Sequence, residues 1–492
     1  MNTVRALIDA AAAATPQAVY ASATESGATL TYAELQQRCR RVAAALQAQG
    51  LRPGDTVSLV MPNGLATLQW LLGAMHGGYG VNPVNLLSQP EQMRYVLQHS
   101  DCRLVLAAPD WADKVRALVP GMPVLTVDPD DLQALPEAQA DRPPPAPDAL
   151  ALLMYTSGTT GNPKGVMLTQ ANLAANAKAI AAEHQLTHED CVLGVLPLYH
   201  INAFAVTMLA PLASGGRVAM APRFSAARFW DQAASGGCTW INVVPTIIAI
   251  LLEGAEAPPR AALARIRLCR SASSALPPEH LSAFERKFGI GVIETMGLTE
   301  TVAPSFSNPL DAKQRKLGSV GRASGGEARV VDAALQPVAD GSTGEILIRG
   351  PHVMRGYYKN PEATAAAFTP DGWLRTGDLG HRDGDGFFFV TGRIKELIIK
   401  GGENIAPREI DEALLKHPAV LDAAAVGIPD PLYGQEILAC VVLRDGQATD
   451  EADLRDFCER ELGRYKTPKA FRFVAELPRG PSGKVQRLKL LG

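Results

Sequence analysis

Short apolar runs alternate with longer amphipathic stretches through the first half of the chain. Runs rich in valine, leucine and isoleucine, such as residues 56–61 and 103–107, are typical of buried strands. Stretches rich in alanine and glutamine, such as residues 32–49, are typical of helices. Because strands that alternate with helices usually pair through crossover connections, the pattern predicts an α/β fold with largely parallel sheets.

The pattern of the chain changes near residue 344. Two strand-like segments, at residues 345–349 and 386–391, are accompanied by turns rich in glycine and aspartate. Closely spaced strands of this kind predict a β-rich subdomain over about residues 318–392.

The segment that follows predicts a separate unit. It begins with a strand at residues 396–400 and continues with a helix, two strands and a second helix, at residues 407–417, 423–427, 437–443 and 451–462. A segment of about 100 residues is long enough to form an α+β domain of its own. We therefore predict a large N-terminal domain over residues 1–392 and a small C-terminal domain over residues 393–492.

Composition and charge narrow the function classes. The chain has 492 residues, of which 47% are apolar and 20% are charged, and this is an ordinary globular composition. Its formal net charge of −3 provides no broad attraction to polyanions, so we expect no nucleic-acid partner. The longest apolar region, residues 192–220, is interrupted by prolines, a histidine and a glycine pair, and it predicts no membrane span.

The cysteines indicate a reducing compartment. Seven cysteines are scattered without a CxxC pair or a histidine cluster, so neither a zinc site nor a disulfide framework is predicted. The N-terminal apolar stretch is interrupted by Asp9 and is too short for a convincing secretory signal. We expect reduced core cysteines and a cytoplasmic protein.

The sharpest local signal is the segment YTSGTTGNPKG at residues 155–165, which follows an apolar strand candidate. Its three glycines allow tight turns, its hydroxyls add donors and Lys164 adds a cation, so a polyphosphate is the natural ligand. The spacing is not that of a Walker A loop, because Lys164 is followed by Gly165 and not by serine or threonine. The alternative interpretation is a surface turn rich in glycine and threonine.

This segment resembles the phosphate-loop signature of the acyl-adenylate-forming superfamily, which includes acyl-CoA synthetases, 4-coumarate–CoA ligases, luciferases and peptide-synthetase adenylation domains. Further signatures of the superfamily follow in the expected order over essentially the whole chain. The resemblance implies a large N-terminal domain and a small, mobile C-terminal domain. It also implies catalytic roles for Thr156 and Lys164 in a loop that binds ATP through Thr156, Ser157, Gly158, Thr159, Thr160, Gly161 and Lys164.

Two further segments resemble the signatures around the adenine. RSASSAL at residues 270–276 resembles the loop that wraps the adenine, and ETMGLTE at residues 294–300 resembles the adenine and magnesium motif. In that motif Thr299 touches the α-phosphate and Glu300 is a catalytic residue that binds Mg²⁺; one carboxylate is sufficient, because phosphates supply other ligands. The implied ATP-binding residues are Ser273, Ser274, Ala275, Glu294, Thr295, Met296, Gly297 and Thr299.

One residue departs from the pattern of the superfamily. Many relatives place an aromatic residue before the glycine of the magnesium motif, where it stacks on the adenine. This chain has Met296, which can pack on a ring but does so more softly.

Further segments resemble the family signatures that bind the ribose of ATP and the thiol substrate, coenzyme A. RTGD at residues 375–378 resembles the ribose-binding signature, in which both oxygens of Asp378 can accept hydrogen bonds from the ribose hydroxyls. The resemblance also implies that Arg393 reaches this ribose and that Lys395 is the hinge between the domains. The loop that lines the tunnel for coenzyme A is implied at Gly401, Gly402 and Glu403.

PSGK at residues 481–484 matches the catalytic lysine motif of the superfamily. The resemblance implies that its lysine, Lys484, also contacts ATP, because it would bridge the substrate carboxylate and the α-phosphate. A lone lysine near a chain terminus would otherwise be interpreted as a solvated side chain. The position of Lys484 after the other motifs favours the catalytic role.

PLYHINA at residues 197–203 resembles the segment whose histidine separates the acyl pocket from the thiol tunnel. We therefore predict a catalytic role for His200, although a buried histidine with only a structural role is the alternative interpretation. The predicted acyl pocket consists of His200, Asn202, Phe204, Val244, Ser271 and Gly297.

The motifs together predict an AMP-forming carboxylic acid:CoA ligase that uses ATP, Mg²⁺ and coenzyme A. A carboxylate attacks the α-phosphorus of ATP, which installs AMP as a leaving group, and a thiol then takes the acyl group. The phosphate loop, Mg²⁺ and Lys484 would offset the charge of two anions that must meet. The small domain would turn about Lys395 between the two half-reactions.

The sequence also bears on the acid. No arginine is apparent in addition to the pocket residues, and Thr295 and Met296 stand where malonate-type relatives place one. A second carboxylate would need such a cation to offset its desolvation, so we favour an aliphatic or aromatic monocarboxylic acid. The alternatives are oxalate or another dicarboxylate, and transfer of the acyl group to a carrier protein in place of CoA; homodimer formation is left open.

Overall fold

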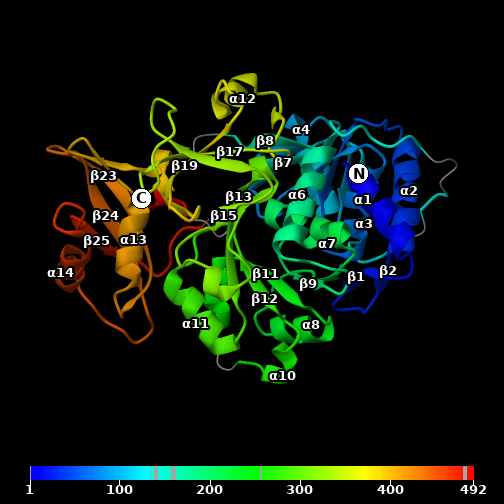
Figure 1. Ribbon diagram of the computed structural model, residues 1–492. Helices are drawn as coiled ribbons and strands as arrows, with labels where there is room; N and C mark the ends of the chain where they lie inside the picture. Colours follow the sequence, from blue (N-terminus) through cyan, green and yellow to red (C-terminus); the bar gives the residue numbers. More distant parts are fainter. Residues whose placement is uncertain are drawn as a thin grey trace.

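The structure is a computed structural model that describes residues 2–132, 135–137, 142–156, 162–254, 257–479 and 485–491. The strands of these residues form four sheets. Figure 1 shows three of them in the body of the molecule and the fourth, in orange and red, at the end opposite to the N-terminus.

The largest sheet is parallel in its centre. Within the described residues its nine strands are, in spatial order, β15 (Arg322–Ala323), β14 (Ala303–Ser307), β13 (Val292–Leu298), β12 (Leu268–Ser271), β11 (Trp240–Val243), β9 (Cys191–Gly194), β10 (Arg217–Met220), β1 (Val19–Ala23) and β2 (Thr29–Thr31). Every neighbouring pair from β13 to β1 is parallel, and the edge strands β2, β14 and β15 are antiparallel.

The second large sheet is also mainly parallel. Its seven strands in the described part of the chain are β18 (Gly356–Tyr357), β8 (Lys164–Thr169), β7 (Leu150–Thr156), β4 (Gly80–Pro83), β3 (Thr56–Val60), β5 (Cys102–Ala107) and β6 (Val124–Thr126). The antiparallel hairpin of β7 and β8 carries the glycine-rich segment at its tip, and β18 pairs with β8.

Helices fill the space between these sheets. The largest apolar core joins residues of both sheets to α1 (Val4–Ala14), α2 (Tyr32–Ala48), α3 (Leu65–His76), α6 (Gln170–Glu183), α7 (Ala210–Ser214) and the π-helix η1 (Ala203–Leu209). All residues of α3 are buried, as expected of a helix that is apolar all round. α2 begins where Thr31 and Glu34 form a capping box.

Further helices connect the strands or cover the outer faces. α4 (Pro90–His99) and α5 (Pro109–Leu118) form a separate apolar cluster with β3 and β5. α8 (Phe229–Ser235), α9 (Pro245–Glu253), α10 (Arg260–Leu263) and α11 (Pro278–Phe288) connect the strands from β10 to β13. The 3₁₀ turns η2 (Thr299–Thr301) and η3 (Ala312–Gln314) follow β13 and β14.

The third sheet is small and antiparallel. It contains β16 (Glu327–Val331), β17 (Gly344–Arg349), β19 (Leu374–Arg382) and β20 (Phe388–Arg393), with α12 (Pro361–Ala367) before β19. Its buried residues pack on Phe306 of β14, so the sheet leans on the edge of the largest sheet. This places β19 and β20 beside the carboxyl end of β13 (Figure 1).

The fourth sheet consists only of residues from 398 onward. It contains β22 (Glu403–Ile405), β21 (Ile398–Lys400), β24 (Gly434–Leu443) and β23 (Val420–Asp430), and β25 (Ala470–Phe473) pairs with β24. α13 (Pro407–Leu415) and α14 (Glu451–Leu462) share one apolar cluster with this sheet, and η5 (Arg487–Leu491) contributes to a second one. The segment therefore has apolar cores of its own, and the 3₁₀ turn η4 (Ile394–Glu396) connects it to β20.

The predicted fold class is confirmed. The two large sheets are mainly parallel, the β-rich segment is antiparallel, and an α+β unit follows. Several elements coincide closely with their predictions, among them α14 at residues 451–462, whereas the strand predicted at residues 423–427 extends over Val420–Asp430. All seven cysteines are buried.

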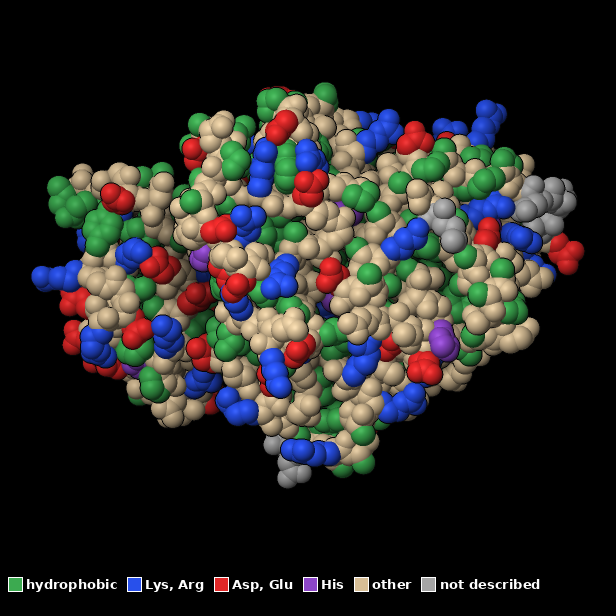
Figure 2. All heavy atoms as spheres, viewed as in Figure 1, with side chains coloured by type: hydrophobic (Ala, Val, Ile, Leu, Met, Phe, Trp, Pro, Cys, Tyr) green, Lys and Arg blue, Asp and Glu red, His purple; other side chains and the backbone are tan. Residues whose placement is uncertain are grey.

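The charge distribution on the surface and the lengths of the helices bear on possible membrane contact. Figure 2 shows basic and acidic side chains interspersed over the visible face of the molecule. Among the described residues, no helix is both long enough and apolar enough to cross a bilayer.

Candidate active site

The predicted site residues gather at the carboxyl ends of neighbouring parallel strands. Asn202 follows β9, Val244 follows β11, Ser271 ends β12, and residues 294–300 form the end of β13 and the turn after it. In open α/β sheets, ligands bind outside the carboxyl ends of the strands. The fold therefore brings together motifs that are up to about 100 residues apart in the chain.

Lys164 and Glu300 both contact the side chain of Tyr357. Thr156 and Lys164 are opposite each other at the tip of the β7–β8 hairpin, and Ser157, Gly158, Thr159, Thr160 and Gly161 lie outside the described residues. The ammonium of Lys164 lies 4.9 Å from the ring centroid of Tyr357, and the Tyr357 hydroxyl donates to Oε1 of Glu300 at 2.8 Å. Burial and the neighbouring Glu300 raise the pKa of Tyr357, which therefore stays a hydrogen-bond donor.

Asp378 and Arg393 form an ion pair across two strands. They are opposite each other on β19 and β20, and Nε of Arg393 lies 2.7 Å from Oδ1 of Asp378. The Asp378 side chain is 4% exposed, whereas that of Arg393 is 39% exposed. The nearby carboxylates of Asp378, Glu396 and Glu300 raise the pKa of Arg393, so the arginine, Asp378 and Glu300 belong to one electrostatic cluster.

The loop after β12 is held by a buried carboxyl group. The backbone N–H of Leu276 donates to Oε1 of Glu294 at 3.2 Å, and Glu294 is 3% exposed. Burial raises the pKa of Glu294 to about 7. Ser273 has a φ of 78°, a strained conformation for a residue with a side chain, and Ser274 and Ala275 lie beside it with exposed surface.

The end of β13 is shaped by a close contact with β14. A Cβ atom on Gly297 would lie 1.8 Å from the carbonyl oxygen of Ala303, so no other residue fits without a backbone shift. Met296 packs on the apolar cluster around Phe306, Thr295 is buried and donates to the carbonyl of Ser271 at 3.4 Å, and Thr299 starts the turn that carries Glu300.

The acyl residues lie deeper in the molecule. Phe204 is fully buried in the π-helix, a wide helical turn that is frequent at functional sites. His200 precedes this helix, and the centroid of its ring lies 4.8 Å from the ring centroid of Tyr199. The hydroxyl of Ser271 is buried and has no hydrogen-bond partner among the described residues.

An arginine lies beside the predicted pocket residues, so the prediction that no further arginine accompanies them is wrong. Arg270 is 1% exposed, and its Nη1 donates to Oδ1 of Asn202 and to Oδ1 of Asn242, each at 2.7 Å. Arg270 and Asn242 are opposite each other on β12 and β11, so both side chains project from the same face of the sheet. A cation therefore lies directly beside the predicted pocket residue Asn202.

The remaining predicted residues lie in the C-terminal part. Lys395 is exposed in η4, between the third and the fourth sheet. Gly401 and Gly402 form the turn between β21 and β22 with φ values of 54° and 87°, which favour glycine, and Glu403 follows with an exposed side chain. Lys484 lies outside the described residues.

Comparison with known proteins supports what this geometry suggests. Residues 8–358 match the AMP-binding enzyme family, and residues 409–484 match the AMP-binding enzyme C-terminal domain. The chain belongs to the AMP-binding enzyme family. The predicted superfamily is thereby confirmed.

Individual relatives of this AMP-binding enzyme are CoA ligases. It is 59% identical to a sulfoacetate–CoA ligase from Cupriavidus necator, over 100% of this chain and 97% of that protein. It is 37% identical to an oxalate–CoA ligase from Arabidopsis thaliana, over 93% of this chain and 92% of that protein. The structure of O-succinylbenzoate coenzyme A synthetase (MenE) from Bacillus subtilis in complex with ATP and magnesium ion is similar with a TM-score of 0.88 and 31% identity, over 99% of both chains.

These matches confirm the predicted class of reaction. This AMP-binding enzyme is an AMP-forming acid:CoA ligase, and ATP and CoA are substrates of such ligases. Its paired charges at one end of the site and its buried polar groups at the other suit the binding of a nucleotide and of a small acid.

Two residues of the site were not predicted, and their signals differ. Tyr357 belongs to no quoted motif, and it reaches Glu300 only because β18 pairs with β8. Arg270 was part of the segment RSASSAL, and a charged residue inside an apolar strand was a signal that could have identified it.

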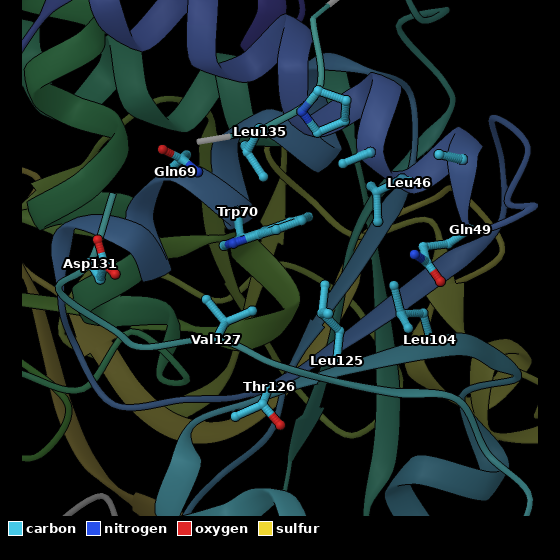
Figure 3. A pocket seen from close by; sticks show the side chains of 13 residues that line it. Leu46, Gln49, Gln69, Trp70, Leu104, Leu125, Thr126, Val127, Asp131 and Leu135 are labelled. Atoms are coloured by element: carbon cyan, nitrogen blue, oxygen red, sulfur yellow. The ribbon is translucent and has the colours of Figure 1, made fainter. Parts of the chain in front are cut away.

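A separate cavity of about 220 Å³ lies away from these residues. Figure 3 shows Trp70 lying across it, among Leu46, Leu125 and Val127. None of the predicted site residues lines it, so this apolar cavity is not the candidate active site.

Proposed function

We propose that the acid substrate of this enzyme is sulfoacetate, which it converts to sulfoacetyl-CoA with ATP and CoA. The sulfoacetate–CoA ligase from Cupriavidus necator is 59% identical over the whole chain, and such similarity supports a shared substrate. The observation that carries the activation chemistry is the convergence of Lys164, Glu300 and the Asp378–Arg393 pair at the strand ends.

The substrate prediction from the sequence is sharpened by this proposal. Sulfoacetate has a single carboxylate, but it also has a sulfonate at the other end of one methylene group. A second anionic group was disfavoured because no cation was expected beside the pocket residues, and the buried Arg270 beside Asn202 provides one.

In the first half-reaction, a carboxylate oxygen of the acid attacks the α-phosphorus of ATP. The new P–O bond forms as the bond to the β-phosphate oxygen breaks, and pyrophosphate leaves. We assign Thr156, Lys164 and the loop between them to the phosphates, Thr299 to the α-phosphate, and Lys484 to the alignment of the carboxylate. Fixed cations act here by positioning and by charge stabilisation.

The nucleotide would be held by residues of three sheets. Asp378 and Arg393 bind the ribose, because a carboxylate accepts from both hydroxyls and Arg393 keeps it in place at 2.7 Å. The loop of Ser273, Ser274 and Ala275 and the strand end of Glu294, Thr295, Met296 and Gly297 surround the adenine.

The residues present fit a magnesium ion that is shared with ATP. In the described part of the chain, no group of three histidine, cysteine or acidic side chains could hold a metal by itself. Glu300 provides one carboxylate beside Lys164, and Mg²⁺ commonly combines one or two carboxylates with phosphate oxygens. When bound, Mg²⁺ supplies positive charge that offsets the phosphates.

In the second half-reaction, the thiolate of CoA attacks the acyl carbonyl, the thioester bond forms, and AMP leaves with the electron pair of the C–O bond. We propose that residues from 396 onward rotate about Lys395 between the half-reactions, so that Gly401, Gly402 and Glu403 line the path of the thiol. The exposed position of Lys395 in a short turn between two sheets supports a hinge. His200 would separate the acyl pocket from this path, with Asn202, Phe204, Val244 and Ser271 as pocket walls.

The proposal is tested by AMP release with ATP, CoA and a panel of acids: sulfoacetate, oxalate, malonate, butyrate and benzoate. We expect sulfoacetate to give the highest kcat/KM, and we expect Lys484→Ala to lower the rate about a hundredfold or more. Lys489→Ala, an exposed lysine five positions further on, serves as the matched control. Higher activity with butyrate or benzoate than with sulfoacetate contradicts the assignment of the acid, and unchanged activity of the Lys484 variant contradicts the mechanism.

A further inference from the structure

Arg270 is a buried cation, and no acidic side chain in the described part of the protein pairs with it. The arginine is 1% exposed. Buried charges are normally paired, because removing an isolated charge from water is costly. Burial lowers the pKa of Arg270 to about 9, so the guanidinium remains charged at neutral pH.

The hydrogen bonds of Arg270 leave part of its guanidinium available. Both bonds to described residues start from Nη1 and end on the amide oxygens of Asn202 and Asn242. Nε is buried and has no partner among the described residues. Amide oxygens accept hydrogen bonds but carry no net charge, so the charge of the guanidinium stays uncompensated.

His184, a further neighbour of Arg270, is also uncharged. Burial and the nearby Arg270 lower the pKa of His184 to about 3, so this histidine is neutral. Its ring lies against Trp240, which is on the same face of the sheet as Asn242. The neighbours named here, Asn202, Asn242 and His184, therefore supply no anion to Arg270.

A line of hydrogen bonds connects Arg270 to the reacting end of the site. Nδ2 of Asn202 donates to the hydroxyl of Ser273 at 3.3 Å, and Ser273 belongs to the strained loop assigned to the adenine. Nδ2 of Asn242 donates to Oδ1 of Asn202 at 3.3 Å, so the two amides brace each other. Asn202 thus lies between the guanidinium and the place where the acyl-adenylate forms.

We propose that Arg270, held by Asn202 and Asn242, binds the sulfonate of the substrate while its carboxylate faces the α-phosphate. This inference rests on the proposed function, in which the acid is sulfoacetate. A sulfonate has one negative charge and three acceptor oxygens, which match the unused donors of a guanidinium. Arg270 therefore selects acids with a second anionic group over uncharged acids of the same size.

Comparison with a nearby arginine, Arg267, shows why Arg270 is distinctive. Arg267 lies three residues earlier, and its Nε is 3.0 Å from Oδ1 of Asp190. Its charge is compensated within the protein, as is usual for a partly buried arginine. Arg267→Met is therefore the matched control for Arg270→Met, because it removes the same side chain nearby without touching the proposed receptor.

The experiment compares two acids of similar shape. Sulfoacetate and 3,3-dimethylbutanoate both have a carboxylate, one methylene and a tetrahedral head, which is charged in the first acid and apolar in the second. For the wild-type enzyme, Arg270→Met, Arg270→Lys and Arg267→Met, kcat and KM are measured with each acid by CoA-dependent AMP release. The KM for ATP and the melting temperature are recorded for each protein.

We expect Arg270→Met to lose about a hundredfold or more in kcat/KM for sulfoacetate, mainly through KM, since the sulfonate contact exists in both ground and transition states. The same variant should keep or increase its activity with 3,3-dimethylbutanoate, so the ratio of the two acids inverts. Arg270→Lys should recover part of the sulfoacetate activity, because it restores a charge without the planar donors. Arg267→Met should leave the ratio unchanged.

A second variant covers the case in which Arg270→Met does not fold. Asn242→Asp changes little in size and gives Arg270 an anion within the protein. We expect this variant to melt no lower than the wild type, to lose sulfoacetate activity at least tenfold, and to keep activity with 3,3-dimethylbutanoate.

The results distinguish an error in the proposed acid, sulfoacetate, from an error in the proposed role of Arg270. If the wild-type enzyme does not use sulfoacetate, the proposed acid and the receptor are both wrong. If it does, but Arg270→Met and Asn242→Asp reduce activity equally with both acids, the acid stands and Arg270 has only a structural role.

Discussion

At the nucleotide end of the site, Asp378 and Glu300 each lie beside an opposite charge or a hydrogen-bond donor, whereas at the acyl end the buried side chain of Arg270 lies among neutral amide groups. Asp378 pairs with Arg393 at 2.7 Å, and Glu300 accepts from Tyr357. Among the described residues, the hydrogen bonds of Arg270 end on the amide oxygens of Asn202 and Asn242. The carboxylates at the nucleotide end are therefore already held by protein groups, whereas the charge of Arg270 at the acyl end is not compensated by any described residue.

This difference follows from what each end must bind. ATP brings ribose hydroxyls and phosphates, and the paired side chains keep one orientation in which to meet them. A small acid offers few contacts, so a single strong charge that has no internal partner gives the largest discrimination between acids. The acyl end obtains this selectivity at the expense of stability, a common arrangement at functional sites.

The largest effect is expected from breaking the pair at the nucleotide end. Asp378→Ala removes the acceptor for the ribose and leaves Arg393 without its main partner. Loss of one member of such a pair costs about 4 kcal/mol, so we expect kcat/KM for ATP to fall about a thousandfold. Steady-state kinetics with varied ATP measures this, and the KM for the acid should change little.

A control for Asp378→Ala lies at the other end of the same strand. Arg382 pairs with Asp340 at 2.7 Å, and both side chains are about half exposed. Asp340→Ala should leave ATP kinetics unchanged. An equal loss in both variants would mean that the pairs only stabilise β19 and that Asp378 does not bind the nucleotide.

Much of the fold followed from local patterns, because helices and strands have their own periodicities. α14 was predicted with its observed bounds, since Asp450 caps an amphipathic helix that ends before a glycine. The strand near residue 423 is longer than predicted, because β23 pairs with β24 over nearly its whole length and pairing extends strands beyond their apolar centre.

The site was predictable where a motif is contiguous and not where it depends on register. Asp378 and Arg393 were each identified from short segments, but their contact depends on the pairing of β19 with β20. Arg270 was overlooked because its meaning depends on Asn242 and Asn202, which lie 28 and 68 residues away. Tyr357 was overlooked for the same reason, since no short motif marks the pairing of β18 with β8.

Glu294, the buried glutamate of the strand end assigned to the adenine, should make the stability of the protein depend on pH. The folded-state pKa of Glu294 is raised from 4.5 to about 7, which corresponds to at most about 3 kcal/mol. Below pH 4.5 the carboxyl group is protonated in both states and costs nothing, and as the pH rises through 7 the folded protein must ionise a buried group. Wild-type stability should therefore fall between pH 4.5 and 7 through this group and level off above.

Glu294→Gln isolates this contribution, because the amide oxygen can still accept from Leu276. We expect the variant to be about 2 kcal/mol more stable than the wild type at pH 8, with the difference vanishing near pH 4.5. Urea unfolding at several pH values measures it, and Glu279→Gln, at an exposed position of α11, controls for net charge. A difference that grows towards low pH would contradict the raised pKa.

The smallest predicted effect on activity tests whether the side chains of the nucleotide end are already in place before ATP and Mg²⁺ bind. Tyr357→Phe keeps the ring beside Lys164 and removes only the hydrogen bond to Glu300. One such bond to a charged group contributes about 1.5 kcal/mol, so kcat/KM should fall about tenfold. Titration of activity and of ATP binding with Mg²⁺ should show weaker magnesium binding, with saturation at a higher Mg²⁺ concentration than in the wild type, because Glu300 is no longer held in place. Tighter magnesium binding by the variant would show instead that Tyr357 competes with the metal for Glu300, and the nucleotide end would then also be waiting for its ligand.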